Sequence, residues 1–530
     1  MRIVIIPLDY QERSLLLDKK DQFIQQHFNS FKTDLSELIS LKGISATNDG
    51  IQDTVAFLTN KLKTLLGADV QIIRTAGSQT ILATISGASN RTILFYGHYD
   101  VMTPGVLSLW HTPPFQLTEK DGRLYGRGIG DNKGQLLAQI FVLYTYKDLH
   151  GKFPFNIKLL IEGEEEQGSK NLPTTINKLK TTELADVDYA IVVDGSFNQS
   201  GDHVLRLGNR GALGFEIKVK TARQDNHSGN LGNIMKNPVL ILMSMINRLI
   251  DLKTGQVTIT DFYTGVHSPS ATEITWIKQL PYDPVAITAQ TGVDSLPSSG
   301  LDFYKRIMFR PTFNVSGINA GYSDHGMKTI IPHEATIKLD CRLVGEQDPS
   351  KIKQAINRIL KPELDSRLAS INYLVEVPPS KTNADQSLIP KIISAIKSAT
   401  GSGLIEPVMP GTVPNYVWTK ILRVPTFTIP YANFDQHNHA PNENMTVKAF
   451  LDGIRISYEL ANGSVVSSLE TAFQRLAKLL KNTVNIFPLF MRLLLLCPSR
   501  HIQSNVLTVQ IYSRINLISL TKNGIKFVKD

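Results

Sequence analysis

The stretch at residues 91–101 reads RTILFYGHYDV, and its nearly continuous apolar run is typical of a strand buried on both faces. A second run of this kind, NIKLLIE, lies at residues 156–162, and a helical pattern at residues 134–149 separates the two. Residues 189–194 predict a further strand. Strands that alternate with helices in this way predict an α/β fold, a mostly parallel sheet with helices on both faces.

On either side of this stretch the pattern changes twice along the chain. Helical spacing at residues 35–41 and 51–66 precedes it. From about residue 202 an α+β pattern follows, with strands at 203–207, 215–221 and 335–344 and helices at 238–252 and 350–360. The αβ pattern then returns with a helix at 388–400, a strand at 426–429 and a helix at 446–461. The sequence therefore predicts an N-terminal extension at 1–30, an α/β domain at 31–201 and 384–463, an inserted α+β domain at 202–383, and a basic tail at 464–530.

Composition and charge exclude several classes of protein. The chain has 530 residues, 42% of them apolar and 19% charged, with a mean hydropathy of -0.07, which is typical of globular proteins and argues against disorder. The net charge of +9 is concentrated in the tail, where nine Lys or Arg face two Asp or Glu. The main body is nearly neutral, so we expect no nucleic-acid partner for it.

The tail from residue 464 has no clear interpretation from its pattern. Its apolar run at residues 489–497 is shorter than the ~20 residues that a membrane span needs, and Arg492 interrupts it. A packed accessory helix, an interfacial membrane contact and a segment foreign to the rest of the fold all remain open, with membrane contact less favoured than the packed helix.

Cysteine use and the first residues bear on the compartment. Two cysteines, Cys341 and Cys497, do not make a disulfide framework, which favours a reducing environment. The apolar run in residues 1–8 is about six residues long, below the ~7–15 residues of a signal peptide core. We therefore expect a cytoplasmic protein.

Acidic residues and histidines follow several of the predicted strands. His98 and Asp100, at the end of the first strand, point to the same side, so the carboxylate can orient a metal-bound imidazole. Asp131 ends the glycine-rich run YGRGIGDNKG at residues 125–134, just before a helix. This run lacks the spacing of a phosphate loop and has an acid where a phosphate would lie. A structural His-Asp pair and an ordinary helix cap are the alternative interpretations.

Three further elements add ligands of the same kind. Residues 162–169 read EGEEEQGS, and these four carboxylates repel one another unless cations or water compensate them. Asp194 stands at the carboxyl end of another strand, where α/β folds place their sites. The loop DQHNHAPNE at residues 435–443 supplies two histidines. A solvated acidic loop explains the run at residues 162–169 alone, but histidines and carboxylates from so many strand ends together indicate zinc or a similar divalent ion.

The ordered motifs resemble the M20 metallopeptidase family, which includes carnosinase-like dipeptidases, aminoacylases and acyl-amino-acid deacetylases. The resemblance covers roughly residues 30–463 and rests on GHYDV, DGRLYGRGIGDNKG, EGEEEQGS, the Asp194 strand, RQDNHSG at 223–229 and HAPNE at 439–443. It implies two divalent metal ions, with zinc favoured and manganese or cobalt as alternatives. The implied ligands are His98 and Asp194 for one ion, Glu166 and His439 for the other, and Asp131 as a bridge.

The resemblance also implies roles for residues beside the metals. Glu165 falls where the family keeps its general base, and Asp100 would orient His98. His227 matches a histidine that reaches across a homodimer to the developing oxyanion, which makes the homodimer an expected assembly. The resemblance further implies that the α/β domain at 31–201 and 384–463 is the metal-binding catalytic domain and that the insertion at 202–383 is a lid or dimerisation domain. Arg342 and Thr412 resemble contacts to the substrate carboxylate.

Some assignments and the substrate stay open at this point. His437 competes with His439, and Glu164 competes with Glu165 by one register step. We expect hydrolysis of an amide bond in dipeptides or short peptides with a free carboxylate. An N-acyl-amino-acid deacylase on the same scaffold is the nearest alternative, although the segment RLGNRGALGFEIKVKTARQDNHSG favours the carnosinase-like branch. A catalytically silent binding protein is the remote one.

Overall fold

A computed structural model describes residues 10–384, 386–462, 509–512, 517–521 and 524–528. The chain divides into two units, Met1–Val466 and Ser467–Asp530. In the second unit, three strands form an antiparallel sheet, β20 (Val509–Tyr512), β21 (Leu517–Thr521) and β22 (Gly524–Val528). The apolar run at residues 489–497 and Cys497 lie outside the described residues.

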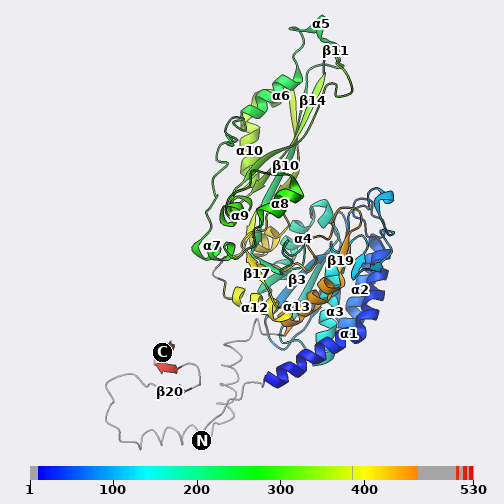
Figure 1. Ribbon diagram of the computed structural model, residues 1–530, viewed down its shortest axis with the longest axis vertical. Coiled ribbons are helices and arrows are strands. Elements are labelled where there is room, and N and C mark those ends of the chain that lie inside the picture. The colour runs from blue at the N-terminus through cyan, green and yellow to red at the C-terminus, as the bar shows by residue number, and fades with distance from the viewer. Residues whose placement is uncertain (1–9, 385, 463–508, 513–516, 522–523, 529–530) are drawn as a thin grey trace, which may run out of the picture. The chain divides into compact units, whose positions relative to one another are not determined.

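The first unit is built on an eight-stranded sheet (Figure 1). Its central strands β6, β3, β7 and β18 are parallel, while the β1–β2 hairpin at one edge is antiparallel, as is the junction of β18 with β8. The prediction of a mostly parallel sheet is thus confirmed. In spatial order the strands are β1 (Asp69–Ile73), β2 (Thr80–Ile85), β6 (Asn156–Glu162), β3 (Thr92–His98), β7 (Tyr189–Val192), β18 (Thr426–Thr428), β8 (Val204–Arg206) and β17 (Leu404–Glu406).

Helices cover both faces of this sheet, because each central strand buries its two sets of alternate side chains in different cores. On β3, Ile93 and Phe95 join one core, and Leu94 and Tyr96 join the other. The first core is covered by α1 (Tyr10–Ser40), α2 (Ile51–Leu66), α3 (Lys133–His150), α12 (Ile389–Thr400) and α13 (Val447–Ala461). The second is covered by α4 (Leu172–Leu179) and the π-helix η3 (Val417–Leu422).

Helix α1 is much longer than the sequence pattern predicted. The pattern indicated a helix at residues 35–41, whereas α1 begins at Tyr10 and crosses the boundary expected at residue 30. Phe23 and Ile24 are buried in the same core as the later turns, and Phe31 stacks on Phe141 of α3 with ring centroids 4.2 Å apart. Tertiary packing therefore extends a helix whose polar composition gives only a weak periodic signal.

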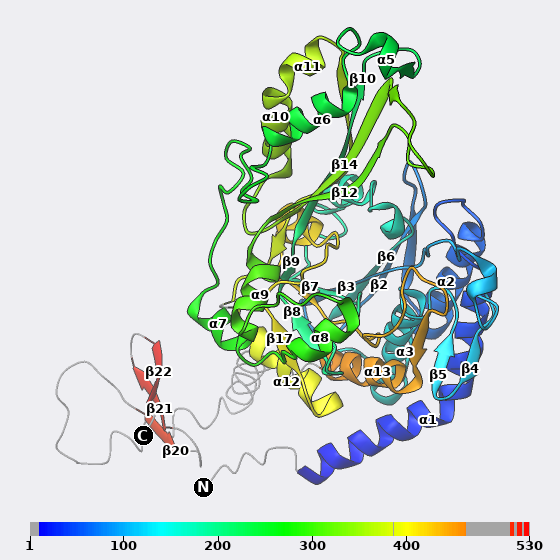
Figure 2. The ribbon, with the colours of Figure 1, turned by 45° about the horizontal axis from the view of Figure 1, so that its top comes forward.

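The inserted part of the chain forms a second sheet with four antiparallel strands, which confirms its α+β pattern (Figure 2). In spatial order they are β12 (Thr312–Ala320), β14 (Glu334–Leu343), β10 (Gly211–Lys220) and β15 (Ala369–Val377). One face packs on α6 (Pro238–Asn247) and α10 (Pro349–Ile359), followed by α11 (Lys361–Asp365). Beyond the far end of this sheet lie β11 (Asn226–His227), α5 (Ser228–Leu231) and β13 (Ile330–Ile331).

The borders of the insertion differ from those expected. Residues 203–207, expected in the insertion, include β8, which pairs with β17 in the large sheet. The next strand, β9 (Gly208–Asn209), pairs with β16 (Ser380–Lys381). Two helices of the insertion, α7 (Ala271–Ile277) and α9 (Gly300–Phe309), pack against β17, and α8 (Pro284–Thr291) lies between them in the chain. The apolar pattern of a short strand does not reveal which sheet it joins, because pairing is decided by distant partners.

A small antiparallel sheet next to the large one holds a loop of the candidate site. It consists of β4 (Thr118–Lys120), β5 (Arg123–Tyr125) and β19 (Asn444–Thr446), preceded by the short helix η1 (Leu107–Leu109). β5 leads into the glycine-rich run before α3, and β19 follows the loop that carries two histidines. The pairing of β5 with β19 therefore joins two motifs that are more than 300 residues apart.

None of the helices in the described ranges combines the length and the apolar character that a membrane crossing requires.

Candidate metal centre

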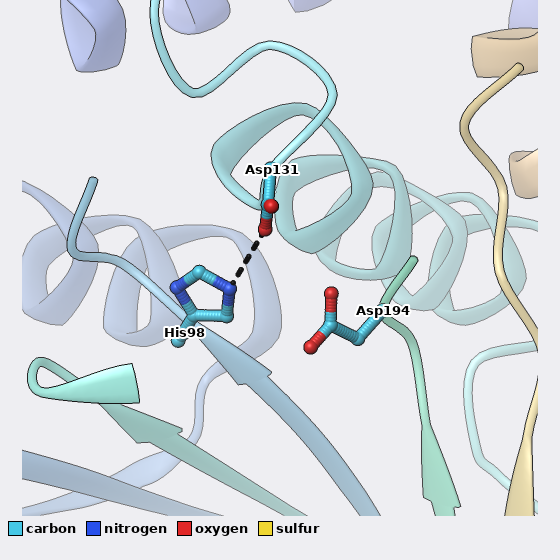
Figure 3. Close-up of side chains that lie close together, drawn as sticks. All are labelled: His98, Asp131 and Asp194. Carbon is cyan, nitrogen blue, oxygen red and sulfur yellow. Dashed lines mark hydrogen bonds and ion pairs between the residues drawn. The ribbon is translucent and has the colours of Figure 1, made fainter. Parts of the chain in front are cut away.

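His98 ends β3 and is fully buried (Figure 3). Its Nδ1 lies 3.0 Å from the backbone oxygen of Asp100 and 3.3 Å from the Asp100 carboxylate. Its Nε2 lies 3.1 Å from Asp131 Oδ1. With Nδ1 held by Asp100, the ring directs Nε2 towards Asp131, an arrangement typical of histidine ligands.

Asp131 lies between two histidines. One carboxylate oxygen faces His98, and the other, Oδ2, lies 3.2 Å from His439 Nε2. Asn438 also donates its side-chain amide to Oδ2, at 3.1 Å. The buried carboxylate of Asp131 is therefore the central group of the site.

Two groups of candidate ligand atoms share this aspartate. His98, Asp131 and Asp194 form the first group, and Asp131, Glu166 and His439 form the second, with the ligand atoms of each group within 4.8 Å of one another. Figure 3 shows the carboxylate of Asp194 beside His98 and Asp131. Glu166 Oε2 lies 2.9 Å from His439 Nε2. The structure thus brings together all five residues that the resemblance implied as ligands.

Asp100 also holds the acidic turn that follows β6. Its two carboxylate oxygens accept hydrogen bonds from the backbone N–H groups of Glu165 and Glu166, each at 3.1 Å. This turn is the short helix η2 (Glu165–Gln167), and it follows Gly163, where a Cβ would lie 2.2 Å from the Tyr99 ring. Only glycine allows the turn to pass this close to the residue that follows His98.

Three carboxyl groups of the site have raised pKa values. Burial, together with the charge of Asp131, raises the pKa of Asp194 to about 6. Burial also raises the pKa of Glu166 to about 7, although the hydrogen bond with His439 opposes it. The pKa of Glu165 is raised by burial and by the neighbouring carboxylates. Buried carboxylates that resist ionisation next to imidazole nitrogens are a donor set that suits divalent cations.

The histidines respond to the same carboxylates in the opposite direction. Burial lowers the pKa of His98, but hydrogen bonds with Asp100 and Asp131 outweigh it and raise the pKa above its usual value. Hydrogen bonds with Asp131 and Glu166 raise the pKa of His439 to about 10. Both shifts have the same cause, the carboxylates that lie within hydrogen-bond distance of each ring.

A cavity of about 350 Å³ adjoins Glu165. Arg342 of β14 and Thr412 line it as well, and Arg342 Nη1 donates to Thr412 Oγ1 at 2.7 Å. The inserted sheet thus contributes an arginine to a cavity that the acidic turn also borders. A guanidinium in this position can bind a carboxylate.

The structure does not bring His227 to these groups. His227 lies on β11, which Figure 1 shows at the end of the insertion far from the large sheet. Its Nδ1 accepts from Gly229 N at 2.9 Å, and its Nε2 lies 3.2 Å from Thr329 Oγ1. His437, the competitor of His439, is exposed and belongs to neither ligand group.

Sequence reasoning missed two asparagines that position the ligands. Asn438 bonds to Asp131, as described above, and Asn132 donates its side-chain amide to Val193 O, at 2.8 Å, next to Asp194. Both residues stand directly beside ligand candidates in their motifs, GDNKG and HNHAPNE. Their position beside candidate ligands could have indicated this role, but asparagine is also common in loops for reasons of local backbone hydrogen bonding.

Comparisons with known proteins agree with the geometry. The chain is 28% identical to the human Beta-Ala-His dipeptidase over 471 residues, which cover 83% of this chain and 91% of that protein. It is 26% identical to the Cys-Gly metallodipeptidase of Schizosaccharomyces pombe, with 83% and 96% covered. Among solved structures, an M20 family metallo-carboxypeptidase from Sulfolobus solfataricus matches with a TM-score of 0.77 and 29% identity, over 82% of this chain and 99% of that one.

The model of peptidase family M20/M25/M40 matches residues 94–463, a range that begins within β3 and ends just after α13. The match therefore includes every candidate ligand residue and the whole inserted sheet. The match spans well over half of the chain, and the chain therefore belongs to peptidase family M20/M25/M40.

Proposed function

We propose that this chain is a two-metal dipeptidase, which hydrolyses the amide bond of dipeptides or short peptides that carry a free carboxylate. The observation that carries the proposal is Asp131, whose carboxylate belongs to both groups of candidate ligand atoms. Similarity to a Beta-Ala-His dipeptidase and a Cys-Gly metallodipeptidase supports the substrate class.

Five side chains would hold the two ions. His98 and Asp194 would bind the first, Glu166 and His439 the second, and Asp131 both. Imidazole and carboxylate ligands together suit zinc, with manganese and cobalt as alternatives. When bound, such ions polarise a carbonyl group and make a water molecule more acidic.

Glu165 would move the proton in the reaction. Its side chain borders the cavity, and its residue is adjacent to Glu166 in the second ligand group. A general base there can take a proton from the attacking water as the carbon–oxygen bond forms. The same carboxyl group then returns this proton to the leaving nitrogen as the carbon–nitrogen bond breaks.

The cavity supports a small substrate with a free carboxylate. Its volume of about 350 Å³ is near the lower end of the usual range for ligand pockets, ~300–1,000 Å³. Arg342, with Thr412 as its hydrogen-bond partner, would bind the substrate carboxylate in the cavity that Glu165 also lines. A long peptide would leave most of its length outside such a cavity.

A substrate screen tests the proposal. We expect the full-length chain, supplied with zinc, manganese or cobalt, to hydrolyse dipeptides and to lose this activity when the substrate carboxylate is amidated. Release of free amino acid, measured with each metal, gives the preference. If N-acyl amino acids are cleaved and dipeptides are not, the protein is a deacylase on the same scaffold, and the dipeptidase proposal is wrong.

We further propose that the inserted domain forms a homodimer. β12 is the edge strand of its sheet, and several large apolar side chains on this domain are exposed. They include Leu240 and Met243 of α6 at 65% and 60% exposure and Ile318 of β12 at 68%. An exposed edge strand and a helix with exposed apolar side chains in the same domain are surfaces that a second copy can cover.

Mixing two inactive variants tests whether His227 acts across this dimer. The His227→Ala chain keeps Glu165, and the Glu165→Gln chain keeps His227, so a hybrid dimer has one complete site. After subunit exchange at equal concentrations we expect about a quarter of wild-type activity, because half of the dimers are hybrids with one working site. If exchange is verified with tagged chains and activity stays absent, His227 does not act across the dimer.

A further inference from the structure

Glu443 is a fully buried carboxylate that accepts four hydrogen bonds from the loop carrying Asp131. Its Oε1 accepts from the backbone N–H groups of Gly130 and Asp131, both at 2.9 Å. Its Oε2 accepts from Gly128 N at 3.0 Å and from Arg127 Nη1 at 2.7 Å. The last residues of the glycine-rich loop are therefore folded around one carboxylate.

Arg127 connects the same loop with the loop of His439. It is buried, and while Nη1 binds Glu443, Nη2 donates to the backbone oxygen of Ala440 at 3.1 Å. Its guanidinium also lies over the Trp110 ring, 5.2 Å from the centroid. Ala440 follows His439 directly. Arg127 thus holds the backbone next to His439, and its partner Glu443 holds the backbone of Asp131.

We propose that the Arg127–Glu443 ion pair is a clamp that sets the separation of Asp131 and His439, and so controls binding of the second metal ion. This inference rests on the proposed two-metal function. Asp131 and His439 both belong to the second ligand group. Asp131 is shared with the first group, but the other two members of that group, His98 at the end of β3 and Asp194 just after β7, form no hydrogen bond with Arg127 or Glu443 among the described residues.

The chemistry of the clamp requires a carboxylate. Glu443 uses both oxygens as acceptors, and each of them faces two donors. A glutamine of the same shape offers one oxygen and one NH₂ group, so two N–H donors would face another donor. The hydrogen bond from Gly128 N also depends on glycine at this position, because its φ of +89° is a backbone conformation that favours glycine.

Titration of the metal-free chain with Zn²⁺ tests the clamp. We expect the wild type, stripped by a chelator and followed by calorimetry and metal analysis, to bind two ions per chain. In Glu443→Gln the affinity for one ion should fall by about 10–100-fold, the usual effect of removing a partner that orients ligands. The affinity for the other ion should fall by a smaller factor, because only one of its three ligands, Asp131, is held by the clamp, whereas His98 and Asp194 are positioned by the large sheet.

Two further variants keep the test decisive. Arg127→Lys preserves the charge, but a single ammonium cannot span Glu443 and Ala440 O in the same way, so it should also weaken one ion. Asp452→Asn is the matched control, because Asp452 is a buried carboxylate that pairs with His203, Lys448 and Arg455, away from the ligand loops. We expect it to lower Tm and leave both zinc affinities unchanged.

The outcomes separate the clamp from the proposed function. If Glu443→Gln and Arg127→Lys bind both ions like the wild type, or lose both equally, the clamp does not exist as described. An equal loss in Asp452→Asn would attribute the effect to general destabilisation and would also overturn it. A wild-type chain that binds fewer than two ions would contradict the two-metal proposal itself.

Discussion

Glu165→Gln is expected to lower kcat by about 10²–10⁴-fold, the usual contribution of a general acid or base, while both metal ions stay bound. Glutamine has nearly the shape of glutamate but cannot take a proton from water at neutral pH. Steady-state hydrolysis of a dipeptide, together with the zinc content of the purified variant, measures both parts of this expectation.

The adjacent glutamate is the matched control for this experiment. Glu164 accepts a hydrogen bond from Asn171 Nδ2 at 2.8 Å and belongs to neither ligand group. Glu164→Gln is therefore expected to keep most of the activity. If Glu164→Gln were inactive and Glu165→Gln active, the general base would be one residue earlier than proposed.

Asp131→Asn is expected to have the second large effect, because both proposed metal ions depend on this one carboxylate. An asparagine offers one neutral oxygen where the aspartate presents two charged ones, so both zinc affinities should fall. We expect each to fall by more than the ~10–100-fold typical of an outer partner, and activity to be lost with them. Calorimetric titration and dipeptide hydrolysis provide the two measurements.

A nearby carboxylate controls for the loss of charge alone. Asp435 lies in the histidine loop but pairs with Arg123 at 2.7 Å, outside both groups. Asp435→Asn should therefore leave the zinc stoichiometry at the wild-type value. If Asp131→Asn bound two zinc ions as tightly as the wild type, Asp131 would not be a ligand of both ions, and this proposal would be wrong.

Much of the fold could be predicted because buried strands and amphipathic helices have local signatures. The bounds of α2 and β6 agree with those predicted from periodicity, and β3 and α3 differ by a few residues. Weakly patterned elements were harder. The edge hairpin of β1 and β2 was not predicted, and β8 was assigned to the wrong sheet, since its three residues carry no information about their distant partners.

The chemistry of the candidate site was visible in the sequence because each ligand residue ends its own strand or lies in a loop beside one. The parallel order of β6, β3 and β7 then implies that Glu166, His98 and Asp194 lie along one edge of the sheet. The position of His439 could not be derived in this way. It depends on a loop held by β19, whose partner β5 lies more than 300 residues earlier in the chain.

By itself, the sequence determined which side chains could bind a metal ion, since residue type and distance from a strand end are local properties. Only the tertiary structure decided that Asp131 faces two histidines, that Asp100 holds the acidic turn, and that the Arg127–Glu443 pair joins two loops. The physical reason is that these are hydrogen bonds and ion pairs between groups far apart in the chain. Their partners are selected when the sheet and its helices pack, and no local pattern of residues records that choice.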